Sequence, residues 1–177
     1  MGLLPDDEVI EVLDRESMKR VLDYIVRAGI GRGLVASLAE SVDVDTDQLA
    51  TLLEQLNDAL EESPAPMYEW PHLVEIFGVD QLARLLAVSP SSVRRYKENA
   101  RTTPDVIAGR LHFLALVVGD LAGAYNDIGI RRWFERARTL LGNRAPQEFL
   151  RGEWSPGDPG PTKVRELARS LVSAAAT

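Results

Sequence analysis

Apolar residues recur every three or four positions along most of this chain, which is the period of amphipathic α-helices. Met18, Val21, Leu22 and Ile25, for example, share one stripe of a helix expected over residues 17–28. The same pattern predicts helices over residues 34–41, 46–60, 72–77, 82–86, 90–97, 104–125, 130–141, 146–150 and 163–172. The fold class is therefore expected to be all-α.

The helices expected over residues 82–86 and 90–97 have the spacing of a helix-turn-helix. Ser89 can cap the second helix by accepting a backbone N–H bond, and Pro90 suits its first position. The small Ala83 allows two helices to cross closely. The residues expected to pack between them are Leu82, Leu85, Leu86, Val93 and Tyr96.

The outward positions of this second helix are polar or basic. The candidate DNA-binding residues are Ser91, Ser92, Arg94, Arg95, Lys97 and, just beyond the helix, Arg101. A helix of this kind can enter the major groove, with serines at its start and basic side chains contacting phosphates or bases. The alternative interpretation is an ordinary helical hairpin whose charged face is solvated.

The net charge of −7 is unevenly distributed. Residues 1–65 carry 5 basic and 15 acidic side chains, whereas residues 66–151 carry 12 basic and 9 acidic ones. Phosphates attract lysine and arginine, so the charge favours DNA binding by the second segment alone. We expect an acidic N-terminal helical domain (1–65), a helix-turn-helix domain with a long spine helix (66–126) and a C-terminal region (127–177).

The acidic domain contains a possible repeat of the same motif. Leu38, Val44 and Leu49 match Leu82, Val88 and Val93 at a constant offset of 44 residues. This favours a second helix-turn-helix, with a winged helix as one form of it, whose acidic surface suits dimerisation or partner binding rather than DNA. The alternative is coincidence, since short helical hairpins share this spacing easily.

Composition limits the remaining chemistry. The chain has no cysteine, no N-terminal signal-peptide pattern and no apolar run long enough to span a membrane, so a soluble, cytoplasmic protein is expected. His72 and His112 lie far apart, and His112 is expected to be a hydrogen-bonded structural residue. We expect no enzymatic activity, no metal site and no cofactor.

The C-terminal segments Arg132-Trp133-Phe134, Leu141 to Pro146, Phe149-Leu150 and Gly152-Glu153 resemble the toxin-binding domain of Xre/MbcA/ParS-like antitoxins. The resemblance covers residues 80–155, and a helix-turn-helix precedes this domain in the family. It implies a homodimeric antitoxin that represses its own operon and neutralises a toxin that consumes NAD. Phe134 replaces the family's leucine. Asn143 replaces the second glycine of a turn that needs positive φ.

In such antitoxins the C-terminal region contacts the toxin. The candidate partner-binding residues are Trp133, Arg138, Arg144 and Trp154. Trp154 lies in a Pro/Gly-rich segment, residues 152–161, expected to be a surface arm that exposes the indole as a partner anchor. Alternatively, Trp154 folds back onto its own helices, and Trp133 is a core residue. The expected function is DNA-binding transcriptional regulation of the antitoxin type; the alternative is a helical module that binds only proteins.

Overall fold

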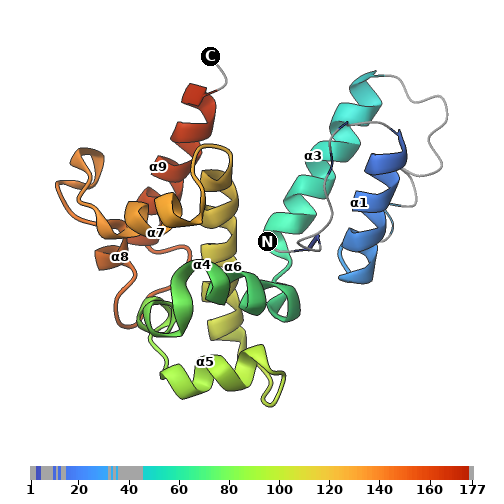
Figure 1. Ribbon diagram of the computed structural model, residues 1–177. Helices are drawn as coiled ribbons and strands as arrows, with labels where there is room; N and C mark the ends of the chain where they lie inside the picture. The colour runs from blue at the N-terminus through green and yellow to red at the C-terminus, as the bar shows by residue number, and fades with distance from the viewer. Residues whose placement is uncertain are drawn as a thin grey trace. The chain divides into compact units, whose positions relative to one another are not determined.

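The computed structural model describes residues 15–31 and 46–175, together with residues 3, 4, 10, 12, 33 and 35 (Figure 1). Its helices are α1 (Arg15–Arg27), α3 (Thr46–Glu62), α4 (Pro66–Leu86), α5 (Pro90–Lys97), α6 (Asp105–Ala122), α7 (Asp127–Glu135), the 3₁₀ helix η1 (Thr139–Leu141), α8 (Pro146–Phe149) and α9 (Pro159–Ala175). These residues contain no strand, only an isolated bridge between Arg138 and Arg144. The expected all-α class is confirmed for this part of the chain.

The chain divides into two compact units, residues 2–64 and residues 65–177. The break lies at the proline-containing linker between α3 and α4. No second break follows residue 126, because α9 packs against α6 and α7 packs against α4. The expected second and third regions therefore share one core.

In the N-terminal unit, α1 buries Leu22 and Ile25 of the predicted stripe, and α3 buries Leu56. The helix expected over residues 34–41, apart from Val35, lies outside the described residues, as does most of the first copy of the possible repeat. The winged-helix interpretation of this unit therefore stays a prediction.

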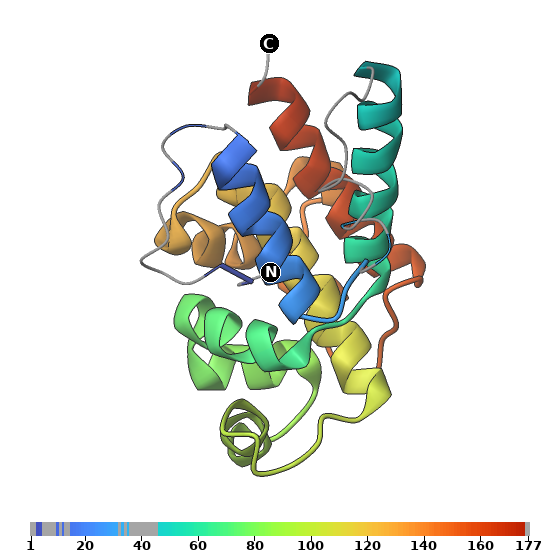
Figure 2. The same cartoon turned by 90° about the vertical axis from the view of Figure 1, so that its right-hand side faces the viewer.

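Helix α6 is the spine of the unit formed by residues 65–177. In Figures 1 and 2 it runs through the middle of this unit, with α4, α7 and α9 against it. Leu111, Leu114, Val117 and Val118 are each at most 1% exposed, and Phe113 is also buried, so buried residues lie on several sides of the helix. A helix that is covered from several sides is apolar nearly all round, so more of its residues are buried than a single amphipathic stripe predicts.

Helix α4 is broken at Gly78, whose φ of 71° and ψ of 163° belong to a region that favours glycine. The break separates a first segment, 66–77, from a second segment, 79–86, that leads to α5. The first segment begins at Pro66, six residues before the expected start at His72. Gly78 thus lets a continuous run of helical residues change direction within the core.

The C-terminal part differs from expectation in two places. The helix expected over 130–141 ends at Glu135, and the chain passes through η1 into a turn at Gly142 and Asn143, with φ of 66° and 61°. Asn143 therefore adopts the positive φ that the resemblance requires. The expected arm is also shorter, because the Ser155 N–H donates to Asp158 Oδ2 (2.7 Å) and α9 starts at Pro159.

Candidate nucleic-acid interface

A serine cap positions the start of α5. Ser89 is extended, with φ −77° and ψ 150°, and its Oγ accepts a hydrogen bond from the Ser92 N–H (3.1 Å). Pro90 occupies the first helical position, where its missing N–H costs no hydrogen bond. Ser91 Oγ lies 2.8 Å from Ser89 Oγ, so several hydroxyls gather at the helix start. The predicted cap is confirmed.

The turn between α4 and α5 depends on Ala87, which adopts a left-handed conformation with φ 55° and ψ 43°. Two hydrogen bonds close the end of α4, from the Val88 N–H to Ala83 O (3.0 Å) and from the Ala87 N–H to Arg84 O (3.4 Å). This is the Schellman arrangement, in which glycine is the usual residue at the left-handed position. Ala87 therefore holds backbone strain that glycine would not.

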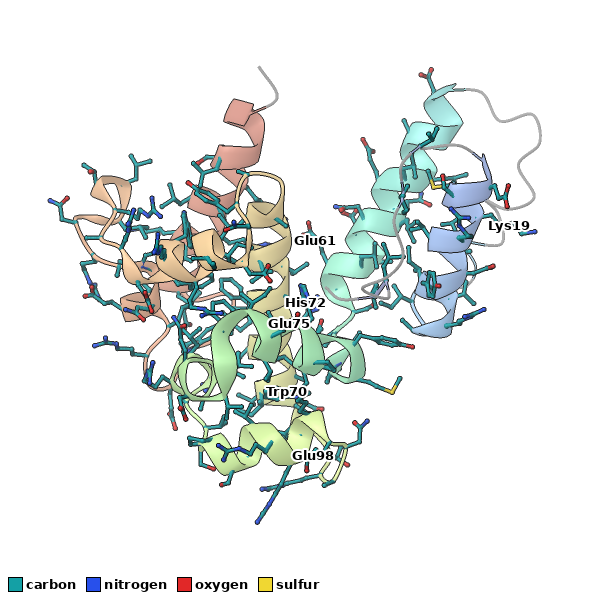
Figure 3. All side chains as sticks on the ribbon, viewed as in Figure 1. Lys19, Glu61, Trp70, His72, Glu75 and Glu98 are labelled. Carbon is teal, nitrogen blue, oxygen red and sulfur yellow. The ribbon has the colours of Figure 1, made fainter. Side chains whose placement is uncertain are left out.

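The inner face of α5 packs as predicted, because Val93 and Tyr96 are buried. The Trp70 ring, labelled in Figure 3, stacks on Tyr96 with centroids 5.3 Å apart. The Trp70 indole N–H donates to Thr103 Oγ1 (2.9 Å). Pro104 is the cap residue of α6, which starts at Asp105, one residue after the expected start.

The outer face of α5 carries the predicted contact residues. Ser91, Arg94, Arg95 and Lys97 are exposed, and Ser92 is half-buried. The exposed Arg101 lies with its guanidinium 5.7 Å from the Tyr96 ring centroid. All six candidates, which lie within residues 91–101, are therefore at least partly accessible to solvent.

The three cations of α5 have no internal partner. Within the described residues, the side chains of Arg94, Arg95 and Lys97 make no hydrogen bond or ion pair. Glu98, at the C-terminal end of the helix in Figure 3, is exposed and follows Ser91, Arg94 and Arg95 at the spacing of one helix face. The surface is basic, with one carboxylate at its edge.

Trp154 is not an exposed anchor. It is 4% exposed, its indole N–H donates to Leu85 O (2.9 Å), and its ring meets Phe113 edge-on at 5.3 Å. The Arg110 Nε–H donates to Trp154 O (2.6 Å). The expectation of an exposed indole is wrong for this residue, because α4 offers a carbonyl for the indole N–H and Phe113 of α6 packs against the ring. The alternative interpretation, folding back onto its own helices, is the one observed.

Trp133 is also a core residue, 1% exposed and packed edge-on against Phe134. This burial agrees with the alternative interpretation, in which Trp133 is a core residue. Arg138 is half-buried, with its guanidinium 5.3 Å from the Trp133 ring centroid. The exposed Arg144 lies over the Phe149 ring at 4.2 Å.

Arg144 also pairs with Glu148, at 3.5 Å between Nε and Oε2. The hydrogen bond from the Ala145 N–H (2.9 Å) is the largest cause that lowers the pKa of Glu148, and Arg144 and Arg151 add to it. Leu140, which pattern analysis did not single out, is 80% exposed on the turn between Arg138 and Arg144.

Two buried polar residues were also missed. Glu69 is 0% exposed, and its Oε1 lies 2.6 Å from His112 Nδ1, so His112 is the hydrogen-bonded structural residue expected. Arg110 is buried and donates to the carbonyls of Leu86 (3.3 Å) and Trp154. The sequence does contain a sign that Glu69 is buried. Glu69 lies four residues before Leu73, so the two share one face of the helix.

No protein-family model, curated protein or solved structure matches this chain. Among the described residues, no single helix has the length and apolar composition that crossing a membrane requires; α6 and α7 pass that test only as a pair, bent by 116°. Within those same residues, no group of three or more His, Asp or Glu side chains is placed to hold a metal ion.

Proposed function

We propose that this protein binds double-stranded DNA through a helix-turn-helix formed by the second segment of α4, the turn at Ala87 and α5. The observation that carries the proposal is the division of α5 into two faces. Val93 and Tyr96 are buried, while Arg94 and Arg95 point away from the core without internal partners.

The chemistry of the outer face fits a DNA groove. Arginine can form paired hydrogen bonds with a guanine edge, and any of the basic side chains can contact phosphate. The serines at the start of α5 lie where the positive end of the helix dipole favours a phosphate group. A charged helix face that is only solvated does not need unpartnered basic side chains behind a serine-rich helix start. Ion pairs with neighbouring carboxylates would keep such a face equally soluble.

The charge distribution limits DNA contact to the unit formed by residues 65–177. With 15 acidic and 5 basic side chains, residues 1–65 repel phosphate. We assign to this N-terminal unit a role in dimerisation or partner binding. A homodimer suits a helix-turn-helix protein, because two recognition helices then meet two half-sites one helical turn of DNA apart.

The resemblance to antitoxins adds a regulatory role: repression of the protein's own operon and neutralisation of a toxin. Trp133 and Trp154 do not take part in toxin contact, because both are buried. The turn that bears Arg138, the exposed Leu140 and Arg144 is the surface left for it. The same exposed leucine supports the second candidate, a module that binds only proteins.

Fluorescence anisotropy with a labelled duplex from upstream of the protein's own gene separates the two candidates. We expect tighter binding to this duplex than to a scrambled duplex, and weaker binding by the double variant R94A/R95A. Each lost phosphate contact should flatten the log–log salt dependence by about 0.9.

The matched control is R132A/R136A, which removes the same charge from exposed positions outside α5. It should retain most of the affinity. Equal affinity and salt dependence in the wild-type protein and R94A/R95A would overturn the assignment of α5.

A further inference from the structure

A pocket of about 230 Å³ lies between α4 and the segment that follows α8. Its lining consists of Gln81, Arg84, Leu85, Gln147 and Arg151. No residue of α5 contributes to this lining, so the pocket is separate from the candidate DNA-binding face. It joins two parts of the chain that are more than sixty residues apart in sequence.

The charged side chains that line the pocket are both arginines. Within the described residues, neither the Arg84 nor the Arg151 side chain makes a hydrogen bond or ion pair. Arg151 does act on Glu148 at a distance, as one of the causes of that residue's lowered pKa. Both arginines are exposed at the same pocket, with no carboxylate among the lining residues, so an anion bound there would meet two positive charges.

The rest of the lining combines polar and apolar side chains. Gln81 is 6% exposed, with its Nε2 3.5 Å from Glu135 Oε1. Leu85 contributes an apolar wall, and its carbonyl accepts the Trp154 indole N–H (2.9 Å). Gln147 supplies a second amide from α8. A few polar groups around an apolar wall are typical of small-molecule sites.

We propose that this pocket binds a small molecule that carries a phosphate or carboxylate group, clamped between the guanidinium groups of Arg84 and Arg151. Guanidinium groups bind both oxyanions through paired, charge-assisted hydrogen bonds. The volume is below the usual range of drug-sized sites, about 300–1,000 Å³, so the ligand is small. It would bridge the helix before the Ala87 turn and the chain after α8.

The tryptophan indole N–H groups allow a direct test by NMR on the full-length protein labelled with ¹⁵N-tryptophan. The chain has three tryptophans. The Trp154 indole N–H donates to the carbonyl of Leu85, a lining residue of the pocket, whereas Trp70 stacks on Tyr96 of α5. Titration with inorganic phosphate, and separately with succinate, at constant ionic strength should move the Trp154 resonance with a Kd in the millimolar range.

The double variant R84Q/R151Q should weaken this binding at least about tenfold and leave the Trp70 and Trp133 resonances in place. The control R132Q/R136Q should titrate like the wild-type protein. A response to phosphate alone, or to succinate alone, identifies which oxyanion the pocket prefers. The proposal is overturned if neither anion moves Trp154, or if R84Q/R151Q responds as the wild-type does. A shift of Trp70 alone would place the anion at α5 and would also overturn it.

Discussion

Replacing Trp154 with alanine tests whether the segment after α8 belongs to the core. The indole is 4% exposed, its N–H donates to Leu85 O, and its ring faces Phe113. The Arg110 guanidinium lies 5.5 Å from the ring centroid. We expect W154A to lower the free energy of unfolding of the unit formed by residues 65–177.

The magnitude follows from what the truncation leaves behind. Removal of a buried tryptophan costs about 3–5 kcal/mol through lost transfer energy and the remaining cavity. The Leu85 carbonyl also loses its hydrogen bond, worth about 1 kcal/mol. We therefore expect about 4–6 kcal/mol for W154A. The variant W154F keeps an aromatic ring against Phe113 but removes the N–H, and should cost about 1–2 kcal/mol.

Urea unfolding followed by tryptophan fluorescence measures this loss in the relevant unit, because Trp70 and Trp133 also lie within residues 65–177. A loss below about 1 kcal/mol for W154A would refute the reasoning. It would show that the indole contributes little to the core, and Trp154 would again be a candidate partner-binding residue.

Three further predictions concern the turn, the DNA-facing surface and the N-terminal unit. A87G should raise the free energy of unfolding by up to about 1 kcal/mol, and the urea midpoint with it, because glycine accepts the φ of 55° without strain; a lower midpoint would contradict this. E98Q should tighten DNA binding roughly twofold in anisotropy titrations, since the Glu98 carboxylate lies on the basic face of α5, and weaker binding would be unexplained. A chain that begins at Pro64 keeps the Ala65 carbonyl that closes the first turn of α4. Provided that this shorter chain still forms a dimer, it should bind DNA at least as tightly as the full chain; loss of binding together with a fall to monomer mass would assign the dimer contact to the N-terminal unit. Loss of binding by this shorter chain while light scattering still reports a dimer would show that the acidic unit touches DNA.

The features of the α4–α5 region that sequence analysis predicted are local. Ser89, Pro90 and the inward pair of Val93 and Tyr96 act within a few residues of one another, so the sequence specifies them without knowledge of the fold. The conformation of Ala87 was not predicted, because a left-handed position is normally signalled by glycine or asparagine. The strain is tolerated because the two closing hydrogen bonds and the packed helices hold it in place.

The errors concern residues whose partners are far away in sequence. The indole of Trp154 bonds to a carbonyl 69 residues earlier, and its own carbonyl accepts from Arg110, 44 residues away. The Pro/Gly composition around Trp154 predicted an irregular backbone, which residues 152–157 have. It could not indicate whether that backbone lies over a partner or over the protein's own helices. The pairing of Glu69 with His112, 43 residues apart, was hidden for the same reason.

These distant contacts meet at the point that orients α5. Carbonyls in the last turn of a helix lack partners within the helix. At the end of α4, the Leu85 carbonyl is bonded by the Trp154 indole and the Leu86 carbonyl by Arg110. Arg110 in turn holds the backbone of Trp154. The direction in which α4 ends, and with it the placement of the turn and α5, therefore depends on α6 and on the segment after α8. The candidate DNA-binding helix is specified locally in its shape, but its orientation is set by the C-terminal half of the same core.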